Sequence, residues 1–451
     1  MSRALFIHVP RITGERREIM VMPQGLIPLA SICEDAGVTT RVIHAGLAGL
    51  DDARSLAALV GKYEPGLIFL PVHWHQQAGA TVEAVSLLSK KLPGVPMVAG
   101  GLAASVFAGE LMGLAPGLAA VIRGDGEAAV SRIARFLARD AQVDWAKVPN
   151  AVWRGRDGVV HDNGITFVLS RRGASKLRHA RFDLMIHPGE YIGAGMSADF
   201  YGPAFHYSPG RGCTYGCSFC GGSRISQTTV TGRSGYFFYG AGKVIRDLLE
   251  ARSFGLESWR VSFDPGRRRD EWLRLARAIN REGMRWRMVF DAWSPPSQGL
   301  TPALASIAMP GSVVVLSPET GNQRLRMRLK GPFHSDADYE AAAEEAVRHG
   351  FGVHLFVSAG LPGEKIRDVE LTAAMVRKFR KWYGASVTAC QMELNPGSRM
   401  HVSPKRHSVR LSRFRLADFI NPRDPVGYQS DGFSTEEIME AITRLQAEAG
   451  E

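Results

Sequence analysis

Short apolar runs alternate with longer amphipathic segments along the first third of the chain. Each run ends in polar residues or glycine, and the runs fall at 4–9, 39–44, 66–72, 95–99 and 118–122. Runs of this length and spacing predict strands. The segments between them predict helices at 23–37, 78–91 and 127–139. Strands that alternate with helices favour an α/β fold, here a parallel, doubly wound, Rossmann-like sheet over residues 1–141.

A second alternation begins at Tyr207. Its first predicted strand starts there, and the others fall at 258–263, 285–290, 312–316, 353–357 and 387–392. Helical patterns separate them at 244–252, 271–282, 337–349 and 366–382. Six strand–helix units predict a partial (β/α)6 barrel of TIM type over residues 206–402. Ligands of such a barrel bind at the carboxyl ends of its strands.

Two segments lack this alternation. Residues 142–205 are predicted to connect the domains and include a hairpin that turns at Asp157-Gly158. Residues 403–451 form a short, α-rich C-terminal segment that is first basic and then amphipathic. Its helix should begin at Ser434, where a capping residue precedes an acidic turn. We expect this helix to cover the open edge of the barrel or to help shape the substrate cavity.

Composition narrows the functional classes. A chain of 451 residues exceeds the roughly 250–300 residues of a single core, so several domains are expected. No apolar run is long enough to span a bilayer, and the start becomes polar too quickly for a secretory signal. Five cysteines, three of them clustered, favour a reducing cytoplasm. The formal charge of +11 favours anionic partners without identifying one.

The candidate chemistry lies in the stretch from Gly212 to Gly222, which contains Cys213, Cys217 and Cys220. Thiolates are soft ligands that select iron–sulfur clusters, zinc or copper. In a four-iron cluster, three cysteines leave one iron free to chelate a ligand. A zinc site is the alternative, but it needs a closed set of four ligands. His206 could be the fourth zinc ligand. The two other cysteines, Cys33 and Cys390, are interpreted as buried apolar side chains.

The cysteine stretch resembles the cluster loop of the radical S-adenosylmethionine (SAM) superfamily, including Phe219 before the third cysteine. The resemblance implies a [4Fe–4S] cluster on the three cysteines and SAM bound to the open iron. Reductive cleavage of SAM to a 5′-deoxyadenosyl radical would follow. The electron would come from an external low-potential donor such as flavodoxin or ferredoxin.

The resemblance also assigns SAM-binding residues. Glu319 follows the fourth barrel strand, where an acidic residue often meets the ribose or the methionine part, and a carboxylate can accept such donors. The alternative is that Glu319 is acidic only because the dipole at the N-terminus of a helix favours a negative charge there. The full set that the resemblance implies is Phe219, Gly221, Asp264, Glu319, Ser358, Glu393 and Leu394.

The N-terminal domain resembles the cobalamin-binding domain that is fused to radical SAM domains. The resemblance rests on the segment from Pro23 to Ala30 and on glycines after the fourth and fifth strands. It implies that the cofactor tail enters beside the fourth strand and that the corrin faces the cluster. The residues implied are Gly100, Gly101, Gly124, Gly126 and Glu127.

One motif of many cobalamin domains is missing. The sequence from His8 to Gly14 does not match D-x-H-x-x-G, whose histidine binds cobalt. The absence favours cobalamin without that histidine, although a domain that binds no cofactor is an alternative. His73 and His75 could approach cobalt or simply line the pocket.

Together these patterns predict a cobalamin-dependent radical SAM methyltransferase. Its substrate would be a small molecule or a peptide of natural-product type, methylated at an unactivated carbon. A radical ring rearrangement, a cyclisation or an oxidation is the alternative. Nucleic-acid modification is a lower alternative because we recognise no second cysteine triplet and no RNA-binding barrel, so nucleic acid is not expected as a partner.

Overall fold

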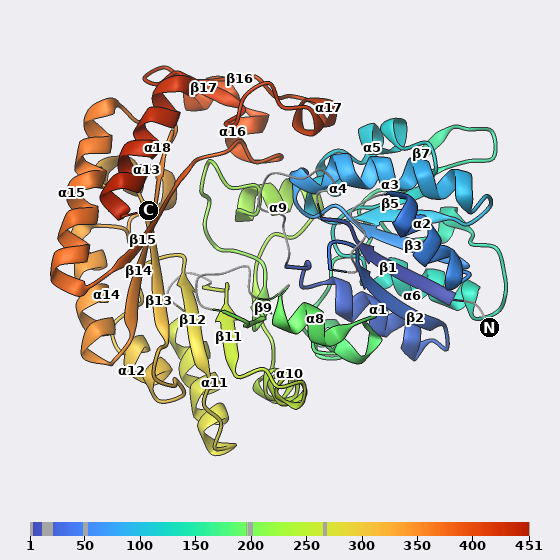
Figure 1. Ribbon diagram of the computed structural model, residues 1–451, viewed down its shortest axis with the longest axis horizontal. Helices are drawn as coiled ribbons and strands as arrows, with labels where there is room; N and C mark the ends of the chain where they lie inside the picture. The colour runs from blue at the N-terminus through green and yellow to red at the C-terminus, as the bar shows by residue number, and fades with distance from the viewer. Residues whose placement is uncertain are drawn as a thin grey trace.

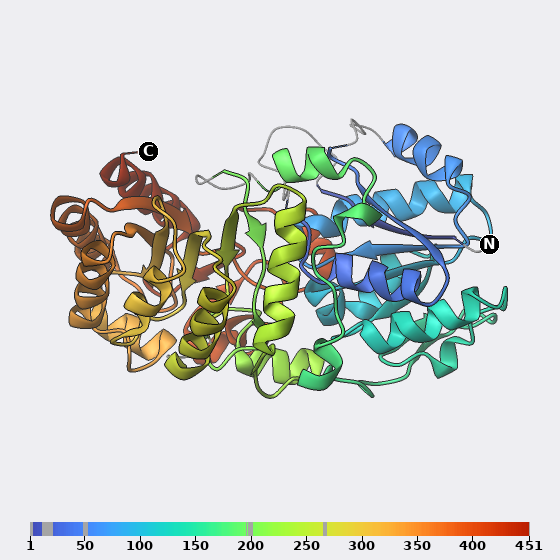
Figure 2. The ribbon, with the colours of Figure 1, turned by 90° about the horizontal axis from the view of Figure 1, so that it is seen from below.

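The computed structural model describes residues 3–10, 21–47, 53–194, 196, 202–264 and 268–450. Two α/β domains lie side by side, and the C-terminal segment crosses between them (Figures 1 and 2). The predicted α/β class with two parallel sheets is confirmed. The sequence from His8 to Gly14 was compared above with a cobalt-binding motif. Of that sequence, Arg11 to Gly14 lie outside the described residues.

The N-terminal domain is built on a parallel sheet. Its parallel strands are β1 (Arg3–His8), β2 (Thr39–His44), β3 (Leu67–Pro71), β4 (Met97–Gly100) and β5 (Leu118–Ile122). They lie in the order β2-β1-β3-β4-β5, with every neighbouring pair parallel. This is the order of a doubly wound fold, and its ligands bind beyond the carboxyl ends of the strands.

Helices cover both faces of this sheet. They are α1 (Leu26–Asp35), α2 (Ala53–Lys62), α3 (Ala78–Lys91), α4 (Leu102–Val106), α5 (Ala108–Leu114) and α6 (Glu127–Leu137), with a 3-10 turn η1 (His75–Gln77). Helix α1 packs against α6, and α2 packs against α3 on the other face (Figure 1). Cover on both faces explains why β1 and β3 are apolar along nearly their whole length.

A hairpin extends the sheet past residue 141. Strand β6 (Ala151–Arg154) pairs antiparallel with β5, and β7 (Val160–Asp162) pairs antiparallel with β6. Gly158 in the turn has a φ of 82°, a conformation that glycine adopts without strain. The predicted hairpin is therefore present, and it closes one edge of the sheet.

The rest of the connector packs between the two domains. It contains η2 (Trp145–Lys147), α7 (Arg171–Ala174), η3 (Phe182–Leu184) and α8 (Pro188–Gly193). The ring of Phe182 lies 5.5 Å from that of Phe254 in the barrel domain, between centroids. Four residues later, Ile186 N–H donates to the Val42 carbonyl of β2, at 2.9 Å. The connector thus binds both domains through apolar and backbone contacts.

The second domain contains six parallel strands; five overlap the predicted ranges, and the first ends one residue before its predicted start at Tyr207. They lie in the order β15-β14-β13-β12-β11-β8. Their bounds are β8 (Phe205–His206), β11 (Ser258–Val261), β12 (Arg287–Ala292), β13 (Val313–Glu319), β14 (Gly352–Ala359) and β15 (Ser386–Gln391). A short antiparallel pair, β9 (Gly210–Arg211) and β10 (Phe237–Phe238), flanks the cysteine loop.

Most helices of the barrel lie outside its strands, but the one after the cysteine loop lies between the domains and packs against α4 (Figure 1). They are α9 (Arg224–Thr231), α10 (Ala241–Ser253), α11 (Arg269–Arg281), α12 (Leu300–Ala305), α13 (Gln323–Lys330), α14 (Asp336–Arg348) and α15 (Ile366–Tyr383). The sequence pattern predicts the four long ones. It does not predict α9, α12 and α13, which have only six to eight residues and show little of the helical period.

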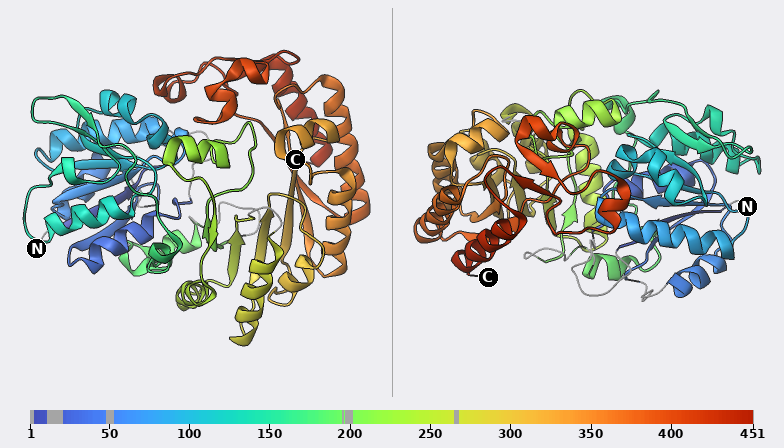
Figure 3. Two further views of the ribbon diagram at one scale, coloured as in Figure 1. Left: turned by 180° about the vertical axis from the view of Figure 1, so that it is seen from behind. Right: turned by 90° about the horizontal axis from the view of Figure 1, so that it is seen from above.

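The C-terminal segment closes the barrel and reaches the other domain. It contains α16 (Arg399–Val402), η5 (Pro404–His407), β16 (Val409–Leu411), α17 (Leu416–Ile420), β17 (Tyr428–Ser430) and α18 (Thr435–Ala449). Helix α18 packs on the edge strand β15, as predicted, and is capped by Ser434 and Glu437. Helix α17 packs against α3 and η1 of the N-terminal domain (Figure 3). None of the helices within the described ranges has the length and apolar character that a membrane crossing needs.

Candidate active site between the two domains

A cavity of about 800 Å³ lies between the N-terminal sheet and the barrel. Its wall includes the carboxyl ends of β3, β4 and β5 on one side and the cysteine loop with the end of β13 on the other. Both domains therefore present the strand ends that bind ligands in their fold classes to one shared space. The volume is in the range of sites that enclose large cofactors.

Cys213, Cys217 and Cys220 line this cavity, and none of them forms a disulfide. A Cβ atom at Gly212 would lie 2.2 Å from the Gly235 carbonyl oxygen, so only glycine lets the chain turn from β9 into the loop. Tyr215 N–H donates to Cys213 Sγ at 3.3 Å. Such backbone donors stabilise charge on metal-bound sulfur.

The three thiols can bind a metal only after they lose their protons. Burial raises the pKa of Cys213 and that of Cys217 to about 12, so each thiol stays protonated unless a metal replaces the proton. Within the described ranges, no three His, Cys, Asp or Glu side chains converge where one metal ion could sit. Zinc needs such convergence, whereas an iron–sulfur cluster gives each thiolate its own iron. The zinc alternative with His206 stays open, and metal analysis of the reconstituted chain tests it.

Glu319 lines the cavity at the end of β13 and is held by two side chains. Lys330 Nζ donates to Glu319 Oε1 at 3.1 Å, and Ser358 Oγ donates to Oε2 at 3.1 Å. Burial alone would lower the pKa of Lys330, but the neighbouring Glu319 carboxylate raises it above its ordinary value. Glu319 has a φ of 66°, which is rare for a residue with a side chain. The pair thus stays charged and fixes one carboxylate beside the cysteine loop.

We expect Lys330→Gln to weaken SAM binding by about ten- to a hundredfold, because the variant leaves a buried carboxylate without its cation. The measurement is equilibrium dialysis of SAM against the anaerobically reconstituted protein. Lys378→Gln is the matched control, since that lysine pairs with Glu340 on the exposed side of α15. Equal SAM affinities for the two variants would show that Lys330 does not hold Glu319 in the position that binds SAM.

Five predicted SAM residues are absent from the cavity wall as the described residues define it: Gly221, Asp264, Ser358, Glu393 and Leu394. A Cβ atom at Gly221 would lie 2.6 Å from the Pro396 carbonyl oxygen, so glycine lets the segment after β15 close against the cysteine loop. Asp264 is buried and accepts hydrogen bonds from the backbone N–H and the hydroxyl of Ser294, at 3.1 and 3.2 Å. It connects the loops after β11 and β12, and its contact with SAM stays a prediction.

Glu393 joins the two domains to the C-terminal segment. Its Oε1 accepts from Arg413 Nη1 at 2.7 Å and lies 3.0 Å from His75 Nε2, while Gln76 donates to Oε2 at 2.9 Å. Burial opposes ionisation, but the hydrogen bonds from His75 and Arg413 hold the pKa of Glu393 below its ordinary value. Leu394 is fully buried, and its N–H bonds to the C-terminal segment. Glu393 and Leu394 thus belong to a set of contacts between both domains and the C-terminal segment, which we call the Glu393 latch. Their contacts with SAM stay a prediction.

The other side of the cavity carries most of the predicted cobalamin residues. The wall includes His73, Gly100, Gly101, Gly124, Gly126 and Glu127. A Cβ atom at Gly101 would lie 2.8 Å from the backbone of Val72 and His73, so this glycine lets the ends of β3 and β4 pack closely. Burial lowers the pKa of His73 to about 4 and keeps its imidazole neutral, the form that can bind a metal.

One atom on this side gives a direct test of fit. Glu127 Oε2 is buried and has no hydrogen-bond partner among the residues that the structure describes. A buried acceptor without a donor is costly, so it needs a ligand N–H or water. The amide side chains of a corrin carry such donors. The wall can therefore accept a corrin amide at Glu127, and this contact stays a prediction.

Four charged side chains connect this wall to the cysteine loop, and we call them the interdomain ion cluster: Asp125, Glu127, Arg211 and Arg233. Arg211 Nη1 lies 2.8 Å from Asp125 Oδ1 and 2.7 Å from Glu127 Oε1. Arg233 also pairs with Asp125. Burial opposes ionisation of Asp125, but Arg211 and Arg233 hold its pKa below its ordinary value. Because Arg211 directly precedes Gly212, these pairs fix the cysteine loop relative to the N-terminal domain.

Glu364 gives the fold a dependence on pH. It is fully buried after β14, where Oε2 accepts from the N–H groups of Gly360 and Leu361 at 2.7 and 3.1 Å. Burial raises its pKa to about 7 from the ordinary 4.5. A raised pKa means that the folded state binds the proton more tightly, so stability is greatest below pH 4.5 and falls as the pH rises through about 7.

We therefore expect Glu364→Gln to unfold at higher urea concentration than the natural chain at alkaline pH and at similar urea concentration near pH 5. The gain in the free energy of unfolding should be about 1–3 kcal/mol, since the amide oxygen still accepts both N–H groups and carries no buried charge. Glu282→Gln on the exposed surface is the control. A gain that does not change with pH would contradict the assigned titration.

Sequence patterns did not reveal Lys330, Arg211 or Arg233. Lys330 ends the short helix α13, and both arginines flank the cysteine loop among many other basic residues. The available signal was weak: two acids, Asp125 and Glu127, follow a buried strand of the N-terminal domain and require cations if they are buried too.

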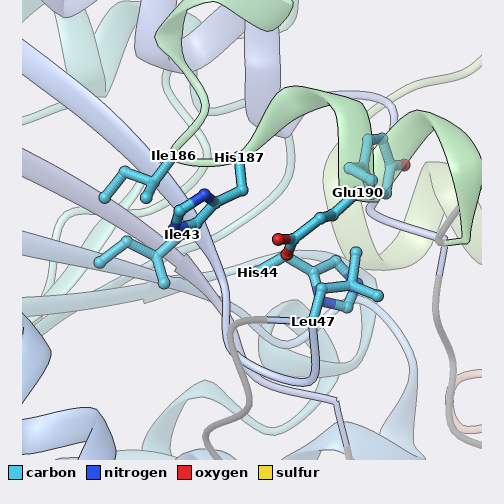
Figure 4. A pocket seen from close by; sticks show the side chains of 7 residues that line it. Ile43, His44, Leu47, Ile186, His187 and Glu190 are labelled. Carbon is cyan, nitrogen blue, oxygen red and sulfur yellow. The ribbon is translucent and has the colours of Figure 1, made fainter.

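A second pocket lies beyond the end of β2 (Figure 4). Ile43, His44 and Leu47 line one side, and His187 and Glu190 at α8 line the other. Its volume of about 10 Å³ is close to that of one water molecule. It is too small for a substrate and belongs to the packing of the connector.

Two family models match the sequence. Residues 11–134 match the B12 binding domain, and residues 207–376 match the radical SAM superfamily. The first range covers the parallel part of the N-terminal sheet, and the second covers the cysteine loop and most of the barrel. No curated protein matches the sequence.

Solved structures share the fold of the whole chain. TsrM from Kitasatospora setae, a radical SAM methyltransferase with bound cobalamin and [4Fe–4S] cluster, has a TM-score of 0.69 at 15% identity, over 99% of this chain and 89% of TsrM. TsrM with tryptophan substrate and a SAM analogue gives 0.70 at 15% identity, with the same coverage. OxsB, a cobalamin-dependent SAM radical enzyme, gives 0.68 at 12% identity, over 99% of this chain and 66% of OxsB. At these identities the likeness establishes the fold.

Proposed function

We propose that this cobalamin-dependent radical SAM enzyme, which joins a B12 binding domain to a radical SAM domain, transfers a methyl group to an unactivated carbon. The observation that supports this most is the shared cavity. Cys213, Cys217 and Cys220 line it from one domain, and the strand ends of the B12 binding domain line it from the other. A methyl donor and a radical source must reach the same substrate carbon, which requires one common space. The substrate would be a small molecule or a peptide.

The cofactors of these two domains are a [4Fe–4S] cluster, SAM and cobalamin. When bound, they supply a radical that takes a hydrogen atom and a methyl group that replaces it. In this proposal the three cysteines hold the cluster. Glu319, fixed by Lys330 and Ser358, accepts hydroxyl or ammonium donors of SAM.

The remaining residues bind the corrin and exclude water. Gly100, Gly101, Gly124 and Gly126 present backbone at the wall, and Glu127 Oε2 offers a buried acceptor. The C-terminal segment, bonded to the N-terminal domain through Glu393, keeps solvent from the space between the domains. The proposal includes an external electron donor of the flavodoxin or ferredoxin type and a cytoplasmic location, because low-potential chemistry needs a reducing compartment.

Anaerobic reconstitution of the full chain tests this function. The protein receives iron, sulfide, hydroxocobalamin and SAM, with reduced methyl viologen as reductant. We expect bound corrinoid in the spectrum, and both 5′-deoxyadenosine and S-adenosylhomocysteine among the products. 5′-Deoxyadenosine without corrinoid or S-adenosylhomocysteine would contradict methyl transfer and favour rearrangement, cyclisation or oxidation.

A further inference from the structure

The C-terminal segment carries a strongly basic surface. Residues 395–424 contain seven Lys or Arg residues and two Asp residues. Arg413 is buried and pairs with Glu393. The other six form no ion pair with any residue in the described ranges. These six define what we call the basic surface: Arg399, Lys405, Arg406, Arg410, Arg415 and Arg423.

The two acids of the segment do not neutralise this surface. Asp418 accepts from the N–H groups of Phe414 and Arg415, at 2.8 and 2.9 Å. Asp424 accepts from the N–H groups of Val426 and Gly427, at 2.9 and 2.5 Å. These N–H groups, together with the nearby Arg423 and Arg415 side chains, hold the pKa of Asp418 below its ordinary value, so the acids offset part of the charge, but seven cations against two acids leave the segment with a net positive charge.

One end of the basic surface meets the cysteine loop. Met400, the neighbour of Arg399, donates its N–H to the Ser218 carbonyl at 3.0 Å, and Ser218 directly follows Cys217. Helix α9 meets the same loop, since Arg224 N–H donates to the Tyr215 carbonyl at 2.8 Å. Figure 3 shows α16 and α17 crossing above the space between the domains. A partner that covers Arg399 would thus lie close to the cysteine loop, and the other five cations follow along the same segment.

We propose that the basic surface docks the acidic protein that delivers electrons to the cluster. This inference rests on the proposed function, which consumes one external electron for each SAM cleaved. The partner is a small acidic protein with a reduced flavin or iron–sulfur centre. The partner would lose one electron, which cleavage of the bond between the sulfur and the 5′ carbon of SAM would consume, and a second electron from the same partner would restore the cobalamin after each methyl transfer.

The position of the surface favours a redox partner over nucleic acid. Electron-transfer complexes are small and transient, and charge complementarity steers them to one spot. Exposed Val402 and Phe414 lie among the cations and add the apolar contact that protein interfaces combine with arginine.

The test compares charge-reversal variants of the reconstituted full chain. The variant Lys405→Glu/Arg406→Glu/Arg410→Glu changes the basic surface. The matched control Arg132→Glu/Arg135→Glu/Arg139→Glu makes the same change of charge on exposed positions of α6 and the turn after it. Stopped-flow absorbance follows cluster reduction by reduced flavodoxin at low and at high salt. Reduced methyl viologen, which is small and not acidic, is the reference reductant.

With flavodoxin at low salt, we expect the surface variant to be reduced at least about tenfold more slowly than the control, and we expect high salt to remove this difference. With methyl viologen, all chains should react alike. Equal flavodoxin rates would overturn the proposal, and so would an equal slowing by methyl viologen, which would indicate a damaged cluster. Unchanged flavodoxin rates with lost binding of unfractionated tRNA would assign the surface to nucleic acid instead. If the natural chain forms no 5′-deoxyadenosine even with methyl viologen, the proposed function fails first, and this inference fails with it.

Discussion

Replacing Cys213, Cys217 and Cys220 together with alanine should abolish SAM cleavage and leave a chain that retains no iron after reconstitution. The three thiols line the cavity, and each would bind a different iron of the cluster. Corrinoid binding should persist, because its predicted contacts belong to the other domain. The measurements are iron and sulfide per chain, the visible spectrum, and 5′-deoxyadenosine formed with methyl viologen.

Cys390→Ser is the matched control for this variant. Cys390 lies on the barrel strand β15, with its sulfur 3.9 Å from the hydroxyl of Ser358, and it is not part of the cysteine loop. The control should keep its iron and its SAM cleavage. Equal iron content in the control and the triple variant would refute a cluster on these cysteines, and one zinc per natural chain would do the same.

The fold was largely predictable because its strands are short, apolar and buried on both faces. Strand β5 occupies Leu118–Ile122, the same residues as the predicted apolar run, and the six barrel strands follow the predicted order along the chain. The helix on Ser434 was predictable from its capping residue. The short helix α13 was not, because eight residues with alternating arginine and apolar side chains do not distinguish helix from strand.

The candidate site was predictable only where local sequence carries the chemistry. The cysteine spacing is local, and the structure brings its three thiols to one cavity. Glu393 shows the limit: its neighbours in sequence suggest a SAM contact, but its carboxylate meets His75 and Arg413. Those partners are separated from Glu393 by 318 and 20 residues, so only the folded chain reveals them.

The contacts between the domains share one physical logic. The Glu393 latch and the interdomain ion cluster each place acids and bases from separate domains in contact, with little water. Buried pairs of this kind add little net stability, but loss of one partner is expensive. They therefore determine the relative position of the two domains more than the strength of their association. For a reaction that needs two cofactors at one carbon, position is the property that matters.

Arg211→Ala should have the second large effect, on both stability and the coupling of the two cofactors. The variant leaves Glu127 without its cation and Asp125 with Arg233 alone. We expect the free energy of unfolding to fall by about 2–4 kcal/mol, somewhat less than for a fully buried pair because the Arg211 side chain is 23% exposed. Urea unfolding measures the loss, with Arg135→Ala on the exposed face of α6 as control.

A double-mutant cycle separates the pair from simple loss of packing. If Arg211 acts through Glu127, the double variant Arg211→Ala/Glu127→Gln should be less destabilised than the sum of the two single variants, because no charge is then left unpaired. Arg211→Lys should restore only part of the stability, since the shorter, more flexible lysine must bring its ammonium to the position where Nη1 meets both carboxylates. Strict additivity across the cycle would contradict the assigned coupling.

The same variant should separate the two half-reactions of the proposed function. Arg211 precedes Gly212, where an added Cβ atom would collide with Gly235. The backbone between the interdomain ion cluster and Cys213 is therefore closely packed and cannot shift freely. With Arg211 released, the cysteines still carry their ligand atoms, and iron content should stay near that of the natural chain. The cysteine loop would, however, lose its fixed position against the corrin wall. We therefore expect iron-replete Arg211→Ala to form more 5′-deoxyadenosine per S-adenosylhomocysteine than the natural chain, and an unchanged ratio would show that the ion cluster supports the fold without aligning the cofactors.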